Sequence, residues 1–285
     1  MNAPESDLKF SPKQALVPTP ALYGEIVGDG MEQLAAVSLS CIDSLGPDAV
    51  VHDVGCGLGA ATSAVVANFK GEGVLIKGSD INKDVVDAYR QNIAKNKWPA
   101  EAFEMDASAL DFPEETFTLS IASGVIFVLP NDGIDAVKEM YRTLKPGGIA
   151  IVNSWAYTPT IPAIHAACKK TRPLGTPLPR QGLEKWEDND FLRAVVIKGG
   201  FTPENVSLEK RNVFVTVGDL KRFATMIWSF IAGTTTAGWL ESDEESWDAA
   251  VDEVVEGLML TEGYEKLADG KNKIMFKANI AVARK

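Results

Sequence analysis

Histidine and cysteine are scarce in this chain of 285 residues, which has two histidines and three cysteines. The cysteines stand at positions 41, 56 and 168, with the spacing of neither a zinc site nor a disulfide framework. We therefore expect no bound metal and free thiols. A reducing, cytoplasmic setting is the simplest interpretation of such cysteines.

Positive charge and long apolar runs are also in short supply. The 28 Lys and Arg residues face 39 acidic ones, and the net charge of -11 disfavours nucleic acid or an anionic membrane as a partner. The most apolar long run, 223–240, contains Ser, Gly and three consecutive Thr, which indicates a buried or lid helix rather than a membrane span. Residues 1–13 contain no signal-peptide core, and 1–20 are expected to form a flexible arm. A small molecule is the expected partner, and the oligomeric state stays open.

What the chain does have is a strand, a glycine-rich turn and a helix in succession. Residues 49–54 are apolar and β-branched, as in a buried parallel strand, and 60–69 have the composition of a helix. Between them stand Gly55, Gly57 and Gly59, which allow unusual backbone angles and close approach of a ligand. This arrangement predicts a small-molecule site at a helix N-terminus.

The glycine turn alone does not identify the ligand, because G-x-G-x-x-A also matches a dinucleotide fingerprint. Asp80 follows the second expected strand, where a carboxylate suits a ribose diol or, alternatively, a helix cap. Asp106 follows the third, and a dinucleotide dehydrogenase needs no acid there. Asp106 therefore counts against a dinucleotide dehydrogenase, unless it only caps the next turn.

The segment Asp53-Val-Gly-Cys-Gly-Leu-Gly59 resembles the first motif of class I S-adenosylmethionine (SAM) dependent methyltransferases. Leu-Lys-Pro-Gly-Gly at 144–148, between a helix and a strand, is similar to another feature of this family. The resemblance implies a Rossmann-like α/β fold, with seven mostly parallel strands, helices on both faces and an antiparallel last strand. It implies one domain over 1–285, with a helical cap at 1–45 and lid insertions at 155–200 and 218–262.

The same resemblance implies the residues that hold the cofactor. Asp80 would bind the ribose, Asp106 the adenine amino group, and Ser123 with Gly124 would border the methionine end, while Tyr23 is as well explained as a core residue as a cover for the cofactor. The full expected set is Tyr23, Asp53, Gly55, Cys56, Gly57, Asp80, Ile81, Asp106, Ala107, Ser123 and Gly124. SAM would be the cofactor and S-adenosylhomocysteine the product.

The loop after the fourth expected strand departs from the family pattern. Thr118 replaces an Asp, and Phe127-Val128 replace a His pair, so an apolar substrate wall is expected there. Phe127, Trp155 and Trp228 are candidates for this wall, although each is as well explained by the core. Ser154-Trp155, Ile161-Pro162 and Leu178-Pro179 resemble fungal secondary-metabolite methyltransferases, including the group that S-methylates reduced gliotoxin.

The predicted reaction is methyl transfer to the sulfur, oxygen or nitrogen of a small, mostly apolar metabolite. SAM has an activated methyl, so positioning supplies much of the acceleration, and a base is needed only for a protonated acceptor. His165 is the one candidate base in the lid region, and a surface or packing role explains it more simply. His52 is expected to be structural. The alternatives are a protein of this fold that binds SAM without methyl transfer, as a pericyclic catalyst or scaffold, and an NAD-dependent oxidoreductase.

Overall fold

The computed structural model describes residues 10–46, 48–69 and 73–285. The chain forms two compact units, which we call the sheet unit and the helical unit. The sheet unit comprises residues 29–157, 184–213 and 277–285, and the helical unit comprises 1–28, 158–183 and 214–276. The segments expected as a cap and as lids are thus divided between the units: 29–45 and 184–200 belong to the sheet unit.

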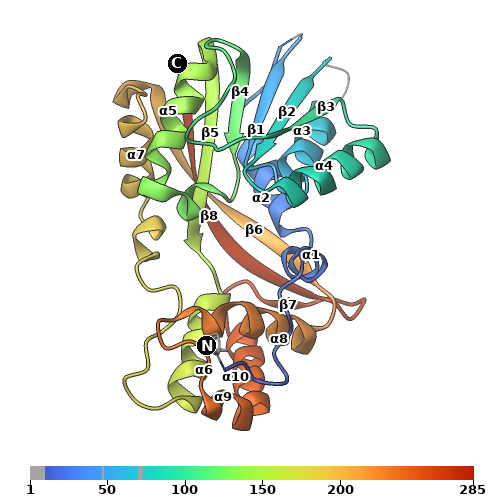
Figure 1. The fold of residues 1–285 in the computed structure, drawn as a ribbon, viewed down its shortest axis with the longest axis vertical. Helices are drawn as coiled ribbons and strands as arrows, with labels where there is room; N and C mark the ends of the chain where they lie inside the picture. The colour runs from blue at the N-terminus through green and yellow to red at the C-terminus, as the bar shows by residue number, and fades with distance from the viewer. Residues whose placement is uncertain (1–9, 47, 70–72) are drawn as a thin grey trace, which may run out of the picture. The chain divides into compact units, whose positions relative to one another are not determined.

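A parallel sheet with an antiparallel end organises the sheet unit (Figure 1). Its strands in spatial order are β3 (Ala100–Glu104), β2 (Leu75–Asp80), β1 (Val50–Val54), β4 (Phe117–Ala122), β5 (Leu144–Tyr157), β8 (Asn272–Arg284) and β6 (Val206–Val217). Strands β1 to β5 pair in parallel, and β8 runs antiparallel to β5. The two-residue strand β7 (Glu265–Lys266) pairs with β8 and was not predicted. The expected Rossmann-like α/β fold, with its antiparallel last strand, is confirmed.

Helices follow the strands as in a doubly wound fold. The helices of the sheet unit are α2 (Gly30–Leu39), α3 (Ala60–Asn68), α4 (Lys83–Asn96), α5 (Ile134–Thr143) and α7 (Asn189–Lys198). Helix α4 packs against β2 and β3, whereas α5 and α7 pack against each other and against β5. Helix α5 ends at Thr143, and Leu144 has an extended backbone. Strand β5 begins at Leu144, so Lys-Pro-Gly-Gly forms its first part. The sequence pattern predicts a strand over 149–153 only, and β5 is longer at both ends.

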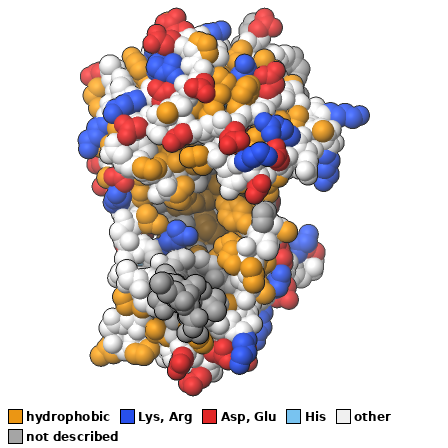
Figure 2. Space-filling model, in the orientation of Figure 1, with side chains coloured by type: hydrophobic (Ala, Val, Ile, Leu, Met, Phe, Trp, Pro, Cys, Tyr) orange, Lys and Arg blue, Asp and Glu red, His pale blue; other side chains and the backbone are white. Residues whose placement is uncertain are grey.

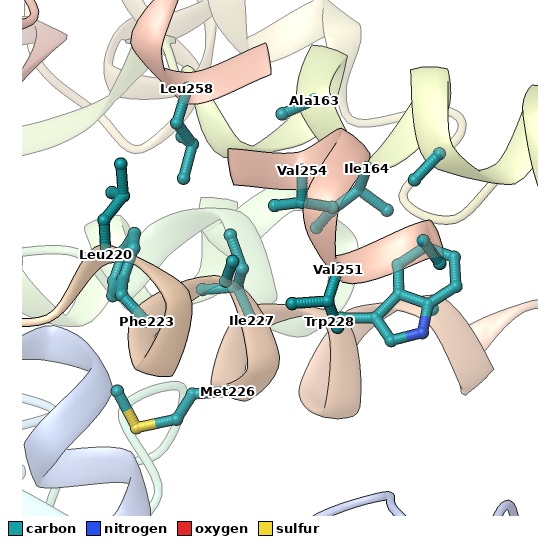
Figure 3. Packing of buried hydrophobic residues seen from close by; sticks show 14 of the residues in the cluster. Ala163, Ile164, Leu220, Phe223, Met226, Ile227, Trp228, Val251, Val254 and Leu258 are labelled. Carbon is teal, nitrogen blue, oxygen red and sulfur yellow. The ribbon is translucent and has the colours of Figure 1, made fainter. Parts of the chain in front are cut away.

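The helical unit has its own hydrophobic core (Figure 3). Its helices are α1 (Pro20–Val27), α6 (Thr160–Thr171), α8 (Leu220–Ile231), α9 (Glu241–Glu245) and α10 (Trp247–Met259). Helix α10 packs against both α6 and α8, and Figure 3 shows Ile227 of α8 beside Val251 and Val254 of α10. The sequence predicts a helix over 220–231 that begins after Asp219, and α8 has these bounds, with the Asp219 side chain accepting from Arg222 N.

Two expectations about the helical unit are wrong. The sequence of 242–260, with Ser242 and Glu245 spaced as a capping box, predicts a single helix, but the helix is interrupted at Ser246. Asp243, not Glu245, reaches back to accept from Leu240 N at 2.8 Å.

The predicted flexible arm lies partly outside the described residues, because 1–9 are not described. Its later part is held in place: Lys13 pairs with Glu244 at 3.0 Å, and Leu16 N donates to Ser229 Oγ at 3.1 Å. Residues 13–16 are therefore part of the helical unit rather than a free arm.

The surface shows acidic and basic side chains interspersed over the face in Figure 2, with hydrophobic side chains between them. Among the described residues, no helix is long and apolar enough to cross a membrane. Within the same ranges, no group of three His, Cys, Asp or Glu side chains is arranged to hold a metal ion.

Candidate cofactor and substrate site

The glycine turn after β1 has the conformation that its sequence predicts. Gly55, Gly57 and Gly59 all have positive φ, at 64°, 54° and 94°. A Cβ at Gly55 would lie 2.7 Å from Val125, and one at Gly59 would lie 2.6 Å from Trp98. A Cβ at Gly57 would meet nothing nearer than Gly55 O at 4.0 Å, so the turn leaves its main chain open at this position, at the carboxyl end of β1.

Asp53 is buried at the end of β1, with 2% of its surface exposed. Its Oδ2 accepts two bonds from Thr62 in the first turn of α3, from the backbone N at 3.0 Å and from Oγ1 at 2.8 Å. Thr62 Oγ1 also lies 2.6 Å from the hydroxyl of Tyr89. Burial raises the pKa of Asp53 from 3.8 to about 7, against the opposing effect of the Thr62 bonds. The buried site thus contains a carboxyl group that titrates near neutral pH.

Asp80 joins the end of β2 to the glycine turn. Its Oδ2 accepts from Gly57 N at 3.2 Å, and its Oδ1 accepts from Asn82 N at 3.0 Å. The turn is further tied to β2 because Cys56 N donates to Ser79 O at 2.9 Å. Helix α4 is capped by Asn82 and not by Asp80. Each Asp80 oxygen retains a lone pair for a further donor.

Asp106 follows β3 and is exposed. Its Oδ1 accepts from Ser108 N at 2.8 Å and from Ser108 Oγ at 2.7 Å, and these bonds lower the pKa of the carboxyl. The turn-capping role that the sequence left open is therefore present. Both bonds end on Oδ1, so this role is compatible with Oδ2 accepting from a ligand.

Ser123 and Gly124 form a turn at the carboxyl end of β4. Gly124 has a φ of 70°, and its N donates to Oδ1 of Asn153 at 2.8 Å. The amide nitrogen of Asn153 donates to Ser123 Oγ at 3.1 Å. The Asn153 side chain, which belongs to β5, thus holds this turn in place.

The remaining expected residues of the sheet unit differ in exposure. Ile81 is 69% exposed and Ala107 is buried. Phe127 and Trp155 are partly exposed, and Val128, next to Phe127, is 60% exposed. Ile81 and Val128 therefore offer apolar surface to a ligand at the ends of β2 and β4.

Cys56 takes part in the glycine turn through its backbone, whereas its thiol is buried. Its side chain is 4% exposed, and burial together with the Asp53 and Asp80 carboxylates raises the pKa of the thiol. A thiol so far from ionisation is a poor nucleophile.

Three expected site residues lie in the helical unit. Tyr23 in α1 is 49% exposed, and desolvation raises the pKa of its hydroxyl. Trp228 is fully buried in the core of this unit and presents no surface to a substrate. His165 in α6 uses Nε2, which lies 2.8 Å from the carbonyl oxygen of Pro179. Since a carbonyl only accepts, this Nε2 donates, which leaves Nδ1 as the nitrogen that could take a proton.

His52 has the structural role expected of it. Burial lowers its pKa to about 3, and its ring stacks on Phe117 with centroids 4.7 Å apart. Its Nε2 lies 2.8 Å from Ser79 Oγ. His52 is thus a neutral core residue.

Two residues of this constellation were missed from the sequence. Thr62 was detectable, because a hydroxyl in the first turn after a glycine loop suits a neighbouring carboxylate. Asn153 gave no local signal, because its partners come from distant parts of the chain.

The comparisons with known proteins agree with this geometry. Residues 51–148 match the family described as methyltransferase domain. Methyltransferase ktnA of Aspergillus niger is 27% identical over 264 residues, covering 84% of this chain and 85% of that protein.

Solved structures share the fold. Phosphoethanolamine N-methyltransferase 2 of Haemonchus contortus, in complex with phosphomonomethylethanolamine and S-adenosylhomocysteine, has a TM-score of 0.53 and 16% identity, covering 93% of this chain and 56% of that one. The [4+2]-cyclase SpnF has a TM-score of 0.50 and 17% identity, covering 89% of this chain and 81% of that one. Residues 51–148 thus match a methyltransferase domain, and the chain has the class I fold of solved SAM-dependent methyltransferases.

Proposed function

We propose that the chain transfers the methyl group of SAM to a small, mostly apolar metabolite through a sulfur, oxygen or nitrogen nucleophile. The observation that carries this proposal is that both histidines of the chain are engaged in structural contacts. His52 is buried and neutral, and His165 could accept a proton only at Nδ1, so we propose that the reaction does not depend on a histidine base. The reaction would then depend on holding the nucleophile in line with the methyl group and excluding water.

The sheet unit fits SAM, because a Cβ at Gly57 would meet nothing nearer than Gly55 O at 4.0 Å, so the turn is open there, and because the Asp80 carboxylate retains lone pairs. Asp80 would accept from the ribose hydroxyls, Asp106 Oδ2 from the adenine amino group, and Ile81 would pack against the adenine. Asp53 and the Ser123–Gly124 turn would border the methionine end. When bound, SAM supplies a methyl group that its sulfonium already activates.

The acceptor would lie against an apolar wall formed by Phe127, Val128 and Trp155. A lone pair of the nucleophile forms the new bond to the methyl carbon as the carbon–sulfur bond breaks, and the pair of that bond stays on the sulfur of S-adenosylhomocysteine. An acceptor ionised in solution, such as a thiolate, needs no base from the protein. A protonated phenol or ammonium would have to lose its proton to solvent.

We place the reaction in the cytoplasm and in secondary metabolism. Cys41, Cys56 and Cys168 are free, which suits a reducing compartment. The resemblance of Ser154-Trp155 and Leu178-Pro179 to fungal secondary-metabolite methyltransferases supports the metabolic setting.

The test is a screen of thiol, phenol and amine metabolites with methyl-labelled SAM. We expect label to transfer to at least one mostly apolar acceptor, with S-adenosylhomocysteine formed in equal amount. A polar or macromolecular acceptor as the preferred substrate would contradict the proposal. An acceptor that is rearranged while all label stays in SAM would instead identify a catalyst that binds SAM without methyl transfer.

A further inference from the structure

Asn153 lies within β5, directly after Val152, the last residue that pairs with β4, and none of its surface is exposed. Its amide makes three hydrogen bonds: Oδ1 accepts from Gly124 N at 2.8 Å, and Nδ2 donates to Ser38 Oγ at 2.9 Å and to Ser123 Oγ at 3.1 Å. One side chain thus joins β5, the turn after β4 and α2, all within the sheet unit.

The orientation of this amide is determined by its partners. Ser38 Oγ donates its proton to Leu34 O at 2.8 Å, so it can only accept from Asn153. Gly124 N can only donate. The nitrogen of the Asn153 amide must therefore face α2, and its oxygen must face the turn.

Helix α2 closes over the same turn. Gly124 has a positive φ, which favours glycine, and a Cβ there would lie 2.1 Å from Met31 Cε at the start of α2, so the Met31 side chain would have to move. The turn thus has Met31 beside it, and the hydrogen bonds from Asn153 hold it in place.

The bond to Gly124 N also directs a carbonyl group. In a trans peptide, the C=O of Ser123 points opposite to the N–H of Gly124. Since that N–H points at Asn153, the Ser123 carbonyl points away from Asn153. A carbonyl oxygen fixed in this way can accept from an ammonium group without reorganising when the ligand binds.

We propose that Asn153 is a positioning residue for the cofactor, which aims the Ser123 carbonyl at the ammonium group on the methionine end of SAM. This inference rests on the proposed function, because it takes the Ser123–Gly124 turn as the place where the methionine end binds. Asn153 touches no cofactor atom in this account and acts through the turn.

The test compares two ligands that differ only where Asn153 acts. S-adenosylhomocysteine has the amino acid end, whereas 5′-methylthioadenosine has the same adenosine and sulfur but no amino acid. We expect Asn153→Ala to weaken S-adenosylhomocysteine by about tenfold or more, since a bond to a charged group is lost, and to leave 5′-methylthioadenosine within about twofold of wild type. Calorimetry measures both dissociation constants. Equal weakening of both ligands would show that Asn153 only supports the fold and would overturn the inference.

Two further variants keep the result interpretable if Asn153→Ala folds poorly. Asn153→Asp keeps an acceptor for Gly124 N, so it should retain most of the selectivity for S-adenosylhomocysteine. Ser154→Ala is the matched control: Ser154 is the next residue of β5, equally buried, and donates to Trp186 O at 3.2 Å. It should leave the ratio of the two constants unchanged.

The outcomes separate this inference from the proposed function. A wild type that binds S-adenosylhomocysteine but methylates no acceptor contradicts the function, and the Asn153 variants still decide the inference. A wild type that methylates, with an unchanged ligand ratio in Asn153→Ala, overturns the inference alone. If the wild type prefers 5′-methylthioadenosine, the assignment of the turn is wrong and the inference falls with it.

Discussion

Thr62 donates two hydrogen bonds to a single carboxylate oxygen of Asp53, at 3.0 Å from its backbone and 2.8 Å from its hydroxyl. The first turn of α3 is thereby locked to the end of β1. The bonds do not offset the desolvation of the carboxyl, so its pKa rises from 3.8 to about 7. This buried group couples the proposed cofactor site to pH.

The first prediction concerns the ligand-free protein. Because the folded-state pKa of Asp53 is raised, the native state holds a proton that the unfolded state has lost. Between about pH 4 and pH 7 this group should therefore reduce the free energy of unfolding as pH rises, by at most about 1.4 kcal/mol per pH unit. Denaturant unfolding of Asp53→Asn should show a shallower decline over this range than wild type. Parallel profiles would contradict the raised pKa.

The second prediction follows from the positive charge of SAM. A cation near Asp53 favours the carboxylate, so binding at pH 7 should release a proton, and affinity should increase from pH 6 to pH 8. Calorimetry in phosphate and in Tris, which differ in ionisation enthalpy, measures the release. Asp53→Asn should release none from this site. Identical proton release by wild type and variant would show that Asp53 does not sense the cofactor.

The third prediction concerns Asp80. If its carboxylate accepts from the ribose hydroxyls, Asp80→Ala should weaken SAM by about tenfold or more, since a hydrogen bond to a charged group contributes about 1.5–3 kcal/mol. Asp87→Ala, an exposed acid on α4, is the control and should bind normally. An Asp80→Ala protein with the wild-type dissociation constant would refute the ribose assignment.

Local patterns predicted the parts of the fold that depend on neighbouring residues. The glycine turn, the start of α8 at Asp219 and the Leu-Lys-Pro-Gly-Gly connection are determined by backbone conformation and caps within a few positions. These features could be placed from the sequence because their partners are local.

Features that depend on tertiary partners could not be placed. Local sequence favours Ser242 as the cap of this helix, but Asp243 makes the capping bond, to Leu240 N. Asp243 also accepts two bonds from the buried Arg172, which comes from a distant part of the chain. Asn153 reads locally as one polar residue near a strand end, and its role depends on α2, more than a hundred residues earlier. Trp228 was proposed for a pocket because aromatic side chains suit pockets and cores equally, and only packing shows it in the core.

The fourth prediction concerns the ion pair of Arg172 and Asp243, whose side chains are 0% exposed and joined by bonds of 2.7 and 2.9 Å. Removing one partner leaves a buried charge, so Asp243→Asn should destabilise the protein by about 3–5 kcal/mol. Replacing both, in Arg172→Met with Asp243→Leu, should recover much of this loss. Lys221→Met breaks an exposed pair with Asp252 and should leave the unfolding midpoint nearly unchanged. Equal effects of the buried and exposed changes would contradict this account.

The fifth prediction separates the aromatic and the basic candidates by steady-state kinetics with the acceptor found in the screen. Trp155→Ala should raise the KM for the acceptor while changing kcat little, because an apolar wall contributes to binding before and during the transfer alike. A fall in kcat with an unchanged KM would remove Trp155 from the proposed wall.

The same kinetics test the basic candidate, His165, whose Nε2 donates to Pro179 O and so ties α6 to the loop that follows it. Loss of a general base costs roughly 10²–10⁴-fold in rate, whereas loss of this loop contact should cost less. We expect His165→Ala to reduce kcat by less than about 100-fold. The variant His165→Gln, which keeps an N–H donor, should recover part of that loss. A thousandfold lower kcat at unchanged KM, with no recovery in His165→Gln, would identify His165 as the base and contradict transfer by positioning.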